Sequence, residues 1–263
     1  MSPLEIRPHA AATELLLSTH PELRDQVAAW AVDGILVDSG GLHTAAELRE
    51  WVAVARPDAI LLGHSHEDHS AGAPVVAAGT LPIYGSRGTA ARLRRPARVP
   101  PYRARLWGQP PAMRVEPVPA GLALRPVPLP GHSPDQLGYL HERSGWLFSG
   151  DLVLRMRQRI AMPGEDPWAM MRSLRAAIAL RPDALATSHR SLIPRPSAVL
   201  RFALDYLEEV AGRILELRRR GATVTLIVNE LFGGEPLNQD GVTWRAYSRG
   251  EFSAARFVRS FLR

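Results

Sequence analysis

The sequence contains no cysteine, no lysine and no long apolar run. Without cysteine, the protein can have no disulfide, no cysteine-ligated zinc or iron–sulfur cluster and no thiol nucleophile. Any bound metal must therefore be held by His, Asp or Glu. No stretch approaches the roughly 18 apolar residues of a membrane span, and the first residues show no basic segment followed by an apolar one. We therefore expect a cytoplasmic protein with no membrane partner.

Because lysine is absent, all 32 basic residues are arginine, and with 26 acidic residues they give a net charge of +6. Codon usage is the simpler explanation of this bias. The alternative is a preference for anionic partners, because a guanidinium binds carboxylate or phosphate through two N–H groups. The segment 87–114 is the extreme case, with eight Arg, five Pro and no acidic residue. We expect it to be a partly irregular surface excursion, either a solvated face or a contact for phosphate, a coenzyme tail or nucleic acid.

Short apolar strands alternate with helical patterns up to about residue 195, which is typical of an α/β fold. Residues 184–186 are the last strand that we predict. Residues 197–220 predict one long amphipathic helix, and the rest of the chain looks helical, although 223–232 fits a strand or a helix. We therefore expect a catalytic domain at 1–196 and a helical extension at 197–263, which covers the substrate pocket or mediates a homodimer.

Three helix starts carry a capping signal. Thr44 with Glu47 and Ser248 with Glu251 have the spacing of a capping box, and Asp166 precedes a proline at the first helical position. We predict that helices begin at each of these points.

The run from His64 to His69 places three histidines and an aspartate within six residues, directly after the apolar residues 59–62. Imidazole and carboxylate are the ligands that hold Zn²⁺, Mn²⁺ or iron. His64 and His66 can chelate one ion from a turn, whereas the adjacent side chains of Asp68 and His69 diverge and suit a second ion. The run therefore predicts a two-metal site rather than one closed structural zinc.

Further ligand types follow the ends of other predicted strands. Side chains placed just past neighbouring strands can converge at one edge of a sheet. These positions are Asp38, His132, Asp151 and His189.

In order and spacing, these motifs resemble those of the metallo-β-lactamase-fold hydrolases over about residues 25–190. The residues that carry the resemblance are Leu36-Val37-Asp38-Ser39-Gly40, His64-x-His66-x-Asp68-His69, Gly131-His132-Ser133, Ser149-Gly150-Asp151 and His189. The resemblance implies a four-layer αβ/βα sandwich with the site along one edge.

The resemblance also implies the ligand set. One metal would be held by His64, His66 and His132, and the other by Asp68, His69 and His189, with Asp151 bridging both. Asp38 would hydrogen-bond beside the ligands, and Asp68 would orient an attacking hydroxide or shuttle its proton, so these two aspartates are the candidate catalytic residues. Two divalent ions, zinc before manganese or iron, would share a bridging hydroxide.

One motif departs from the usual pattern around the last ligand. Relatives of the glyoxalase II and small endonuclease type carry Pro-Gly-His-Gly, whereas this chain has Thr187-Ser188-His189-Arg190. Arg190 is therefore a candidate substrate-binding residue at the mouth of the pocket.

Three functions remain open from the sequence. The favoured one is hydrolysis of a small ester, thioester or lactone, with an anionic substrate as one option, because the stretch 131–135 resembles that of thioesterases and lactonases. A nuclease or phosphodiesterase of the same fold is the alternative that the arginines suggest. An iron-bound oxidoreductase is the third, disfavoured because no flavin-binding domain is fused.

Overall fold

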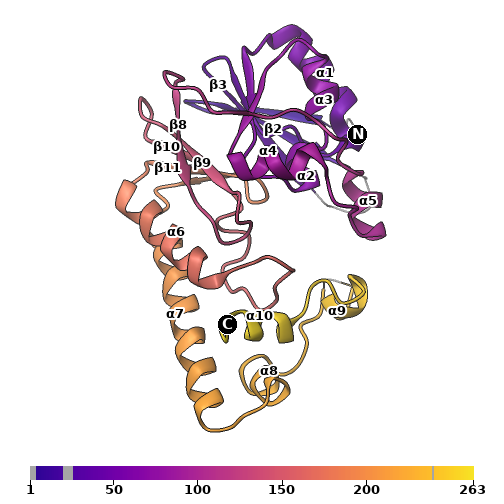
Figure 1. The fold of residues 1–263 in the computed structure, drawn as a ribbon. Helices are drawn as coiled ribbons and strands as arrows, with labels where there is room; N and C mark the ends of the chain where they lie inside the picture. Colours follow the sequence, from indigo (N-terminus) through magenta and orange to yellow (C-terminus); the bar gives the residue numbers. More distant parts are fainter. Residues whose placement is uncertain (1–3, 20–25, 239) are drawn as a thin grey trace. The chain divides into compact units, whose positions relative to one another are not determined.

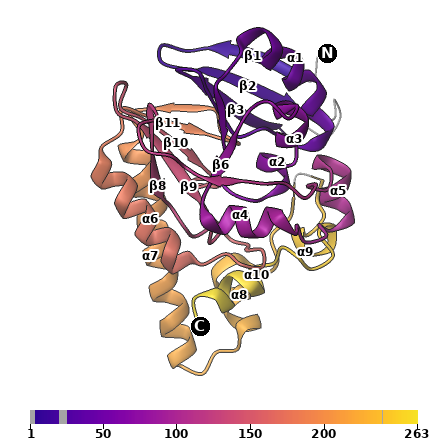
Figure 2. The same cartoon turned by 45° about the horizontal axis from the view of Figure 1, so that its top comes forward.

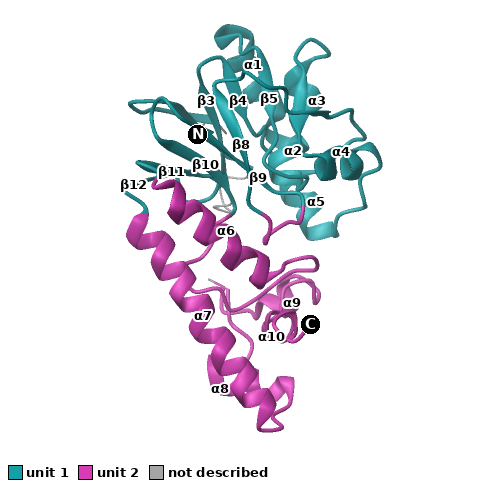
Figure 3. Cartoon of the chain, turned by 60° about the vertical axis from the view of Figure 1, so that its left-hand side comes forward, with its two compact units in different colours: residues 1–129, 135–151, 182–196 teal, residues 130–134, 152–181, 197–263 magenta. Residues whose placement is uncertain are grey.

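The structure, a computed structural model, describes residues 4–19, 26–238 and 240–263. Residues 1–3 belong to the N-terminal stretch in which we expect no basic segment followed by an apolar one, and they lie outside the described residues. The chain forms two compact units, shown in teal and magenta in Figure 3. Unit 1 comprises residues 1–129, 135–151 and 182–196, and unit 2 comprises residues 130–134, 152–181 and 197–263. The division at residue 196 into a catalytic domain and an extension stays a prediction.

Unit 1 contains a seven-stranded sheet in which the strands follow chain order. The first four strands pair antiparallel and the last four pair parallel. The strands are β1 (Leu4–Pro8), β2 (Thr13–Ser18), β3 (Gln26–Val32), β4 (Ile35–Val37), β5 (Ala59–Leu61), β6 (Ile83–Gly85) and β7 (Glu116–Pro117).

A second sheet of unit 1 has the order β12-β11-β10-β9-β8. Only the β10–β11 pair is parallel. Its strands, most of them labelled in Figure 2, are β8 (Leu124–Pro128), β9 (Leu137–His141), β10 (Trp146–Gly150), β11 (Ala184–Thr187) and β12 (Leu192–Pro194). The prediction that 184–186 is the last strand was wrong, because the short edge strand β12 follows it.

Two apolar cores explain why β5 and the residue after it are wholly apolar. Ile60 and Leu62 pack with the helices α1 (Ala45–Ala55) and α3 (Ala73–Ala77), whereas Ala59 and Leu61 pack with residues of the second sheet. Successive side chains of a strand point to opposite faces, so a strand covered on both faces needs no polar position. Unit 1 is therefore layered as helices, sheet and sheet (Figures 1 and 2).

The arginine-rich segment 87–114 is more regular than expected. It contains α4 (Arg87–Arg94), whose N-cap Ser86 accepts a hydrogen bond from Thr89 N, and α5 (Pro101–Trp107). Leu93, Leu106 and Trp107 are buried in the core between the first sheet and its helices. The remaining short helices of unit 1 are the 3₁₀ turn η1 (Leu42–Thr44) and α2 (Glu67–Ser70).

The helices of unit 2 are α6 (Pro167–Leu180), α7 (Ser197–Arg219), α8 (Val224–Phe232), α9 (Trp244–Tyr247) and α10 (Ala254–Ser260). The long helix α7 was predicted correctly, and its apolar stripe is buried from Leu200 to Leu217. It packs against α6 and α8. Residues 224–232 are helical, which resolves the alternative that the sequence left open. Among the described residues, no helix has both the length and the apolar character needed to cross a bilayer.

Two of the three predicted helix starts are confirmed, although only one of those two has the predicted side-chain cap, and the third is wrong. Asp166 caps α6 by accepting hydrogen bonds from Trp168 N and Ala169 N. Thr44 precedes α1 but makes no side-chain cap, because its hydroxyl donates to Gly41 O. Ser248 closes the turn before Phe252, and the last helix begins later, capped by Ser253.

Candidate metal centre

The histidine-rich run forms the turn after β5 together with the short helix α2. Asp38, at the end of the neighbouring strand β4, anchors this turn: its Oδ1 accepts a hydrogen bond from Gly63 N at 2.7 Å. The backbone of Asp38 is left-handed, with φ of 62°, and its own N–H donates to Leu61 O at 2.8 Å. This unusual conformation turns the carboxylate toward the loop rather than along the strand.

The second oxygen of Asp38 holds His69. Its Oδ2 lies 2.8 Å from His69 Nδ1, and both side chains are buried. The carboxylate accepts a hydrogen bond from the Nδ1–H group and so leaves Nε2 as the basic nitrogen of the ring, an arrangement typical of metal-binding histidines.

His69 Nε2 points at two carboxylates. It lies 3.4 Å from Asp151 Oδ1 and 3.8 Å from Asp68 Oδ2. His189 Nε2 approaches the same two residues, 3.2 Å from Asp68 Oδ2 and 3.7 Å from Asp151 Oδ2. His189 is fixed from behind, because its Nδ1 donates to Gln26 O at 2.9 Å.

Two overlapping groups of ligand atoms result. The ligand atoms of His64, His69 and Asp151 lie within 4.8 Å of one another, and so do those of Asp68, His69 and His189. His66 extends the first group, since its Nδ1 lies 2.9 Å from His64 Nε2. The structure thus brings six of the seven predicted ligands together in unit 1.

A metal ion fits this cluster because of His69. Its Nε2 is fully buried and has no hydrogen-bond partner among the described residues. A ring nitrogen that faces only carboxylates is repelled by them unless positive charge, from a proton or a bound cation, lies between the two. Divalent ions bound by imidazole and carboxylate supply that charge, so the donor set suits Zn²⁺, Mn²⁺ or iron.

The pKa values of His69 and Asp68 also indicate that the cluster favours positive charge. Burial lowers the pKa of His69, but Asp151, Asp38 and Asp68 outweigh it and raise that pKa well above the ordinary value. Burial raises the pKa of Asp68, but His69 and His189 outweigh it and hold that pKa well below the usual range. Asp68 is therefore ionised at neutral pH.

Two predicted site residues remain, and each is described by itself. His132 belongs to unit 2, where its Nδ1 lies 3.1 Å from Glu165 Oε1, so its partnership with His64 and His66 stays a prediction. Arg190 is exposed, and its backbone N–H donates to Thr187 Oγ1 at 2.9 Å. Its proposed contact with substrate likewise stays a prediction.

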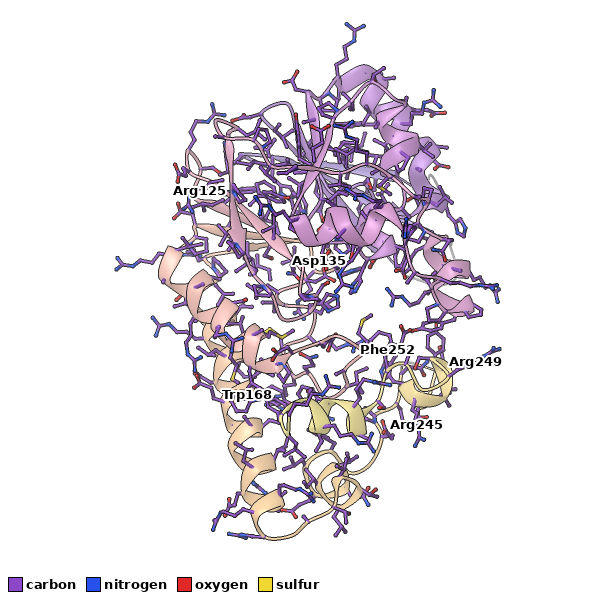
Figure 4. All side chains as sticks on the ribbon, in the orientation of Figure 1. Arg125, Asp135, Trp168, Arg245, Arg249 and Phe252 are labelled. Atoms are coloured by element: carbon purple, nitrogen blue, oxygen red, sulfur yellow. The ribbon has the colours of Figure 1, made fainter. Side chains whose placement is uncertain are left out.

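The sequence did not identify two groups that hold the histidine-rich turn. Asp135 Oδ2 accepts hydrogen bonds from Ser65 N and from Thr89 Oγ1 of α4, each at 2.9 Å, and Figure 4 labels this residue beside α4. Arg103 of α5 forms a two-pronged ion pair with the buried Glu67, with Nη2 at 2.6 Å from Oε2. The available signals were the aspartate that follows the Gly-His-Ser-Pro stretch and the glutamate inside the histidine-rich run.

Comparison with known proteins adds the family. The model of the metallo-beta-lactamase superfamily matches residues 24–189. No curated protein sequence matches the chain.

Solved structures share the fold. A metallo-beta-lactamase family protein from Thermus thermophilus is 16% identical with a TM-score of 0.69, over 97% of this chain and 92% of that one. A beta-lactamase domain protein from Burkholderia ambifaria is 20% identical with a TM-score of 0.68, over 98% of this chain and 88% of that one. The protein TTHA1623, solved in a di-iron-bound form, is 28% identical with a TM-score of 0.56, over 69% of this chain and 95% of that one.

Proposed function

The chain belongs to the metallo-beta-lactamase superfamily, and we propose that it is a hydrolase that uses two divalent metal ions to cleave an ester, a thioester or a lactone. The proposed ligands of the first ion are His64, His66 and His132, those of the second are Asp68, His69 and His189, and Asp151 would contact both. The expected fold is supported by the two sheets, the helices and the C-terminal helical region, which match those of the superfamily.

The observation that carries this proposal is the state of His69. Its Nδ1 is held by Asp38 at 2.8 Å, and its buried Nε2 faces Asp68 and Asp151. A purely structural histidine at this depth would use both nitrogens in hydrogen bonds, because an unsatisfied buried polar atom costs about 1–3 kcal/mol. An arrangement kept at that cost supports a metal-binding role.

When bound, the ions would supply Lewis acidity toward a carbonyl oxygen and would lower the pKa of a water molecule. The protein's own residues would do the rest. Asp68, ionised and partly exposed, can accept a proton from the attacking water and pass it to the leaving group. Asp38 and Gln26 O would keep His69 and His189 in their orientations during this transfer.

The arginine-rich segment gives only weak support to a nucleic acid substrate. Arg103 neutralises Glu67, Arg92 Nε lies 3.5 Å from Asp135 Oδ1, and Arg114 pairs with Glu116 at 2.9 Å. Three of the eight arginines of the segment are thus already paired with carboxylates of the chain, and such arginines release fewer counterions from a phosphate backbone. We therefore propose a small, anionic substrate, with Arg190 at the pocket mouth, ahead of a phosphodiester.

We propose zinc as the metal, with manganese or iron as alternatives. The di-iron form of TTHA1623 supports iron as the alternative metal, which the oxidoreductase hypothesis would require. Elemental analysis of the protein as isolated separates these cases, because a predominance of iron with no hydrolytic activity would contradict the zinc hydrolase.

The proposal is tested with chelator-stripped protein reloaded with zinc. We expect about two ions per chain, together with hydrolysis of at least one class among acyl-thioesters, aryl esters and lactones. Loss of activity on all three classes, with activity on bis(4-nitrophenyl) phosphate, would instead establish the phosphodiesterase.

A matched pair of variants links activity to the site. Asp38→Asn removes the carboxylate behind His69 and should weaken binding of one ion about 10- to 100-fold. Asp33→Asn is the control, because Asp33 also pairs with a buried histidine, His141, at 2.9 Å, in the turn at the opposite end of β4. Equal effects of the two variants would show that the loss is merely structural.

A further inference from the structure

Unit 2 contains a second buried pair of a carboxylate and a histidine. Glu165 Oε1 lies 3.1 Å from His132 Nδ1, and each side chain is only 5% exposed. Glu165 is not part of any motif that pointed to the metal centre. Its geometry nevertheless resembles that of Asp38 and His69, in which the carboxylate also faces Nδ1.

The backbone fixes the register of this pair. Asp166 N donates to Gly131 O at 2.8 Å, which ties the residue after Glu165 to the residue before His132. Ser173 Oγ of α6 donates to Pro130 O at 2.6 Å. A Cβ at Gly131 would lie only 2.5 Å from Met170 Cα, so the loop 130–134 and α6 are in close backbone contact. Glu165 therefore reaches His132 from a rigid support.

The other carboxylate oxygen of Glu165 is also held. Its Oε2 accepts a hydrogen bond from Gln158 Nε2 at 2.7 Å, and Gln158 O accepts one from Tyr206 of α7 at 2.9 Å. With both oxygens engaged, the carboxylate cannot rotate away from the imidazole. Helix α7 thus contributes to the position of His132 through two intervening residues.

We propose that Glu165 is a positioning residue that selects the tautomer and the orientation of His132 as a metal ligand. By accepting a hydrogen bond from the Nδ1–H group, it leaves the lone pair on Nε2 for the ion. The inference rests on the proposed function, in which His132 binds a metal. It assigns to the C-terminal region a role in that site, exerted through Tyr206 and Gln158.

The test combines metal binding with the tautomer of His132. Glu165→Gln removes the charge and should lower the affinity for one zinc equivalent about 10- to 100-fold while the other equivalent keeps its affinity. In the metal-free protein, long-range ¹H–¹⁵N correlation should show the Nδ1–H tautomer of His132 in the wild type and loss of that tautomer in the variant. Asp33→Asn serves as the control and should change neither measurement.

A reciprocal exchange keeps the test decisive if Glu165→Gln alone folds poorly. In the double variant Glu165→Gln, Gln158→Glu, the carboxylate at 158 accepts a hydrogen bond from the amide at 165. The amide oxygen at 165 is then left to face His132 Nδ1. We expect the Nδ1–H tautomer to return, which a role in packing alone would not produce.

The outcomes separate the two proposals. If His132→Ala loses one zinc equivalent but Glu165→Gln keeps wild-type affinity and the Nδ1–H tautomer, the positioning role is refuted and the metal site stands. If His132→Ala retains both equivalents, the ligand assignment within the proposed function is wrong.

Discussion

Replacing Arg103 with methionine tests how the arginine-rich segment supports the metal-binding turn. Glu67 is 2% exposed at its side chain and Arg103 is 13% exposed, so the pair is largely shielded from water. Methionine fills a similar volume but leaves the carboxylate of Glu67 without its cation. Breaking a buried pair by removing one partner costs about 3–5 kcal/mol. We expect the free energy of unfolding of metal-free Arg103→Met to fall by that amount.

The loss of stability in Arg103→Met should depend on pH, because it depends on the charge of Glu67. Burial raises the pKa of Glu67, and Arg103 only partly offsets that effect. Without Arg103 the pKa of Glu67 in the folded state rises further, so the folded state binds this proton more tightly than the unfolded state. The difference in stability between variant and wild type should therefore be small below the unfolded pKa of Glu67 and grow as pH rises through the folded pKa.

The assay is urea denaturation of chelated protein followed by far-ultraviolet circular dichroism at several pH values. With a slope of about 3 kcal/mol per molar urea, the midpoint should drop by roughly 1–2 M at neutral pH. Arg143→Met is the matched control, because Arg143 pairs with Asp33 but is 75% exposed, and its loss should cost about 0–1 kcal/mol. A double variant Glu67→Gln, Arg103→Met should recover most of the loss. A pH-independent loss, or a loss no larger than that of the control, would refute the reasoning.

Two further substitutions test the supports of the site. Gly131→Ala should destabilise the protein by about 3 kcal/mol or more, because the added Cβ would lie 2.5 Å from Met170 Cα. Gly79→Ala is the control: Gly79 also has a positive φ but faces open space, so this variant should cost about 1–2 kcal/mol. Equal shifts in melting temperature would contradict this account. Asp135→Ala removes the carboxylate that accepts hydrogen bonds from Ser65 N and Thr89 Oγ1. It should lower the melting temperature and also the zinc affinity of the His64–His66 turn, which competition with a chelator measures. An unchanged affinity would show that the turn holds its shape without Asp135.

Elements with a strong local pattern could be predicted from the sequence. The stripe of α7 and the Asp-Pro start of α6 are examples, because helical periodicity and an N-cap act within a few residues. The predicted cap at Ser248 was wrong because a local pattern does not show which of two nearby serines begins the helix. Ser248 has a glutamate three residues later and Ser253 does not, but the hydroxyl of Ser248 donates to Trp244 O and accepts from Phe252 N, so Ser253 caps the helix.

The residues of the candidate site likewise fall into those that a local pattern could predict and those that it could not. Ligand types such as His64, His66 and Asp151 could be identified because they follow strand ends, which topology brings together. Glu165, Asp135 and Arg103 could not, because each acts on a residue at least 33 positions away. Such contacts depend on how loops pack, for which a single sequence carries no periodic signal.

Removing residues 197–263 tests how far the rest of the protein depends on its C-terminal helices. A chain that ends at Pro196 lacks the partner of α6, the Tyr206 bond to Gln158 and the backbone pairing of Ser253 with Ala161. The apolar stripe of α7 has six predicted positions, all buried, namely Leu200, Leu204, Leu207, Val210, Ile214 and Leu217. At about 1.5–3 kcal/mol each, their burial amounts to about 9–18 kcal/mol, comparable with the whole stability of a typical domain. We expect the truncated chain to sediment as aggregate after expression. A soluble truncated chain that binds two zinc ions with unchanged affinity would show that α7 supports neither the fold nor His132.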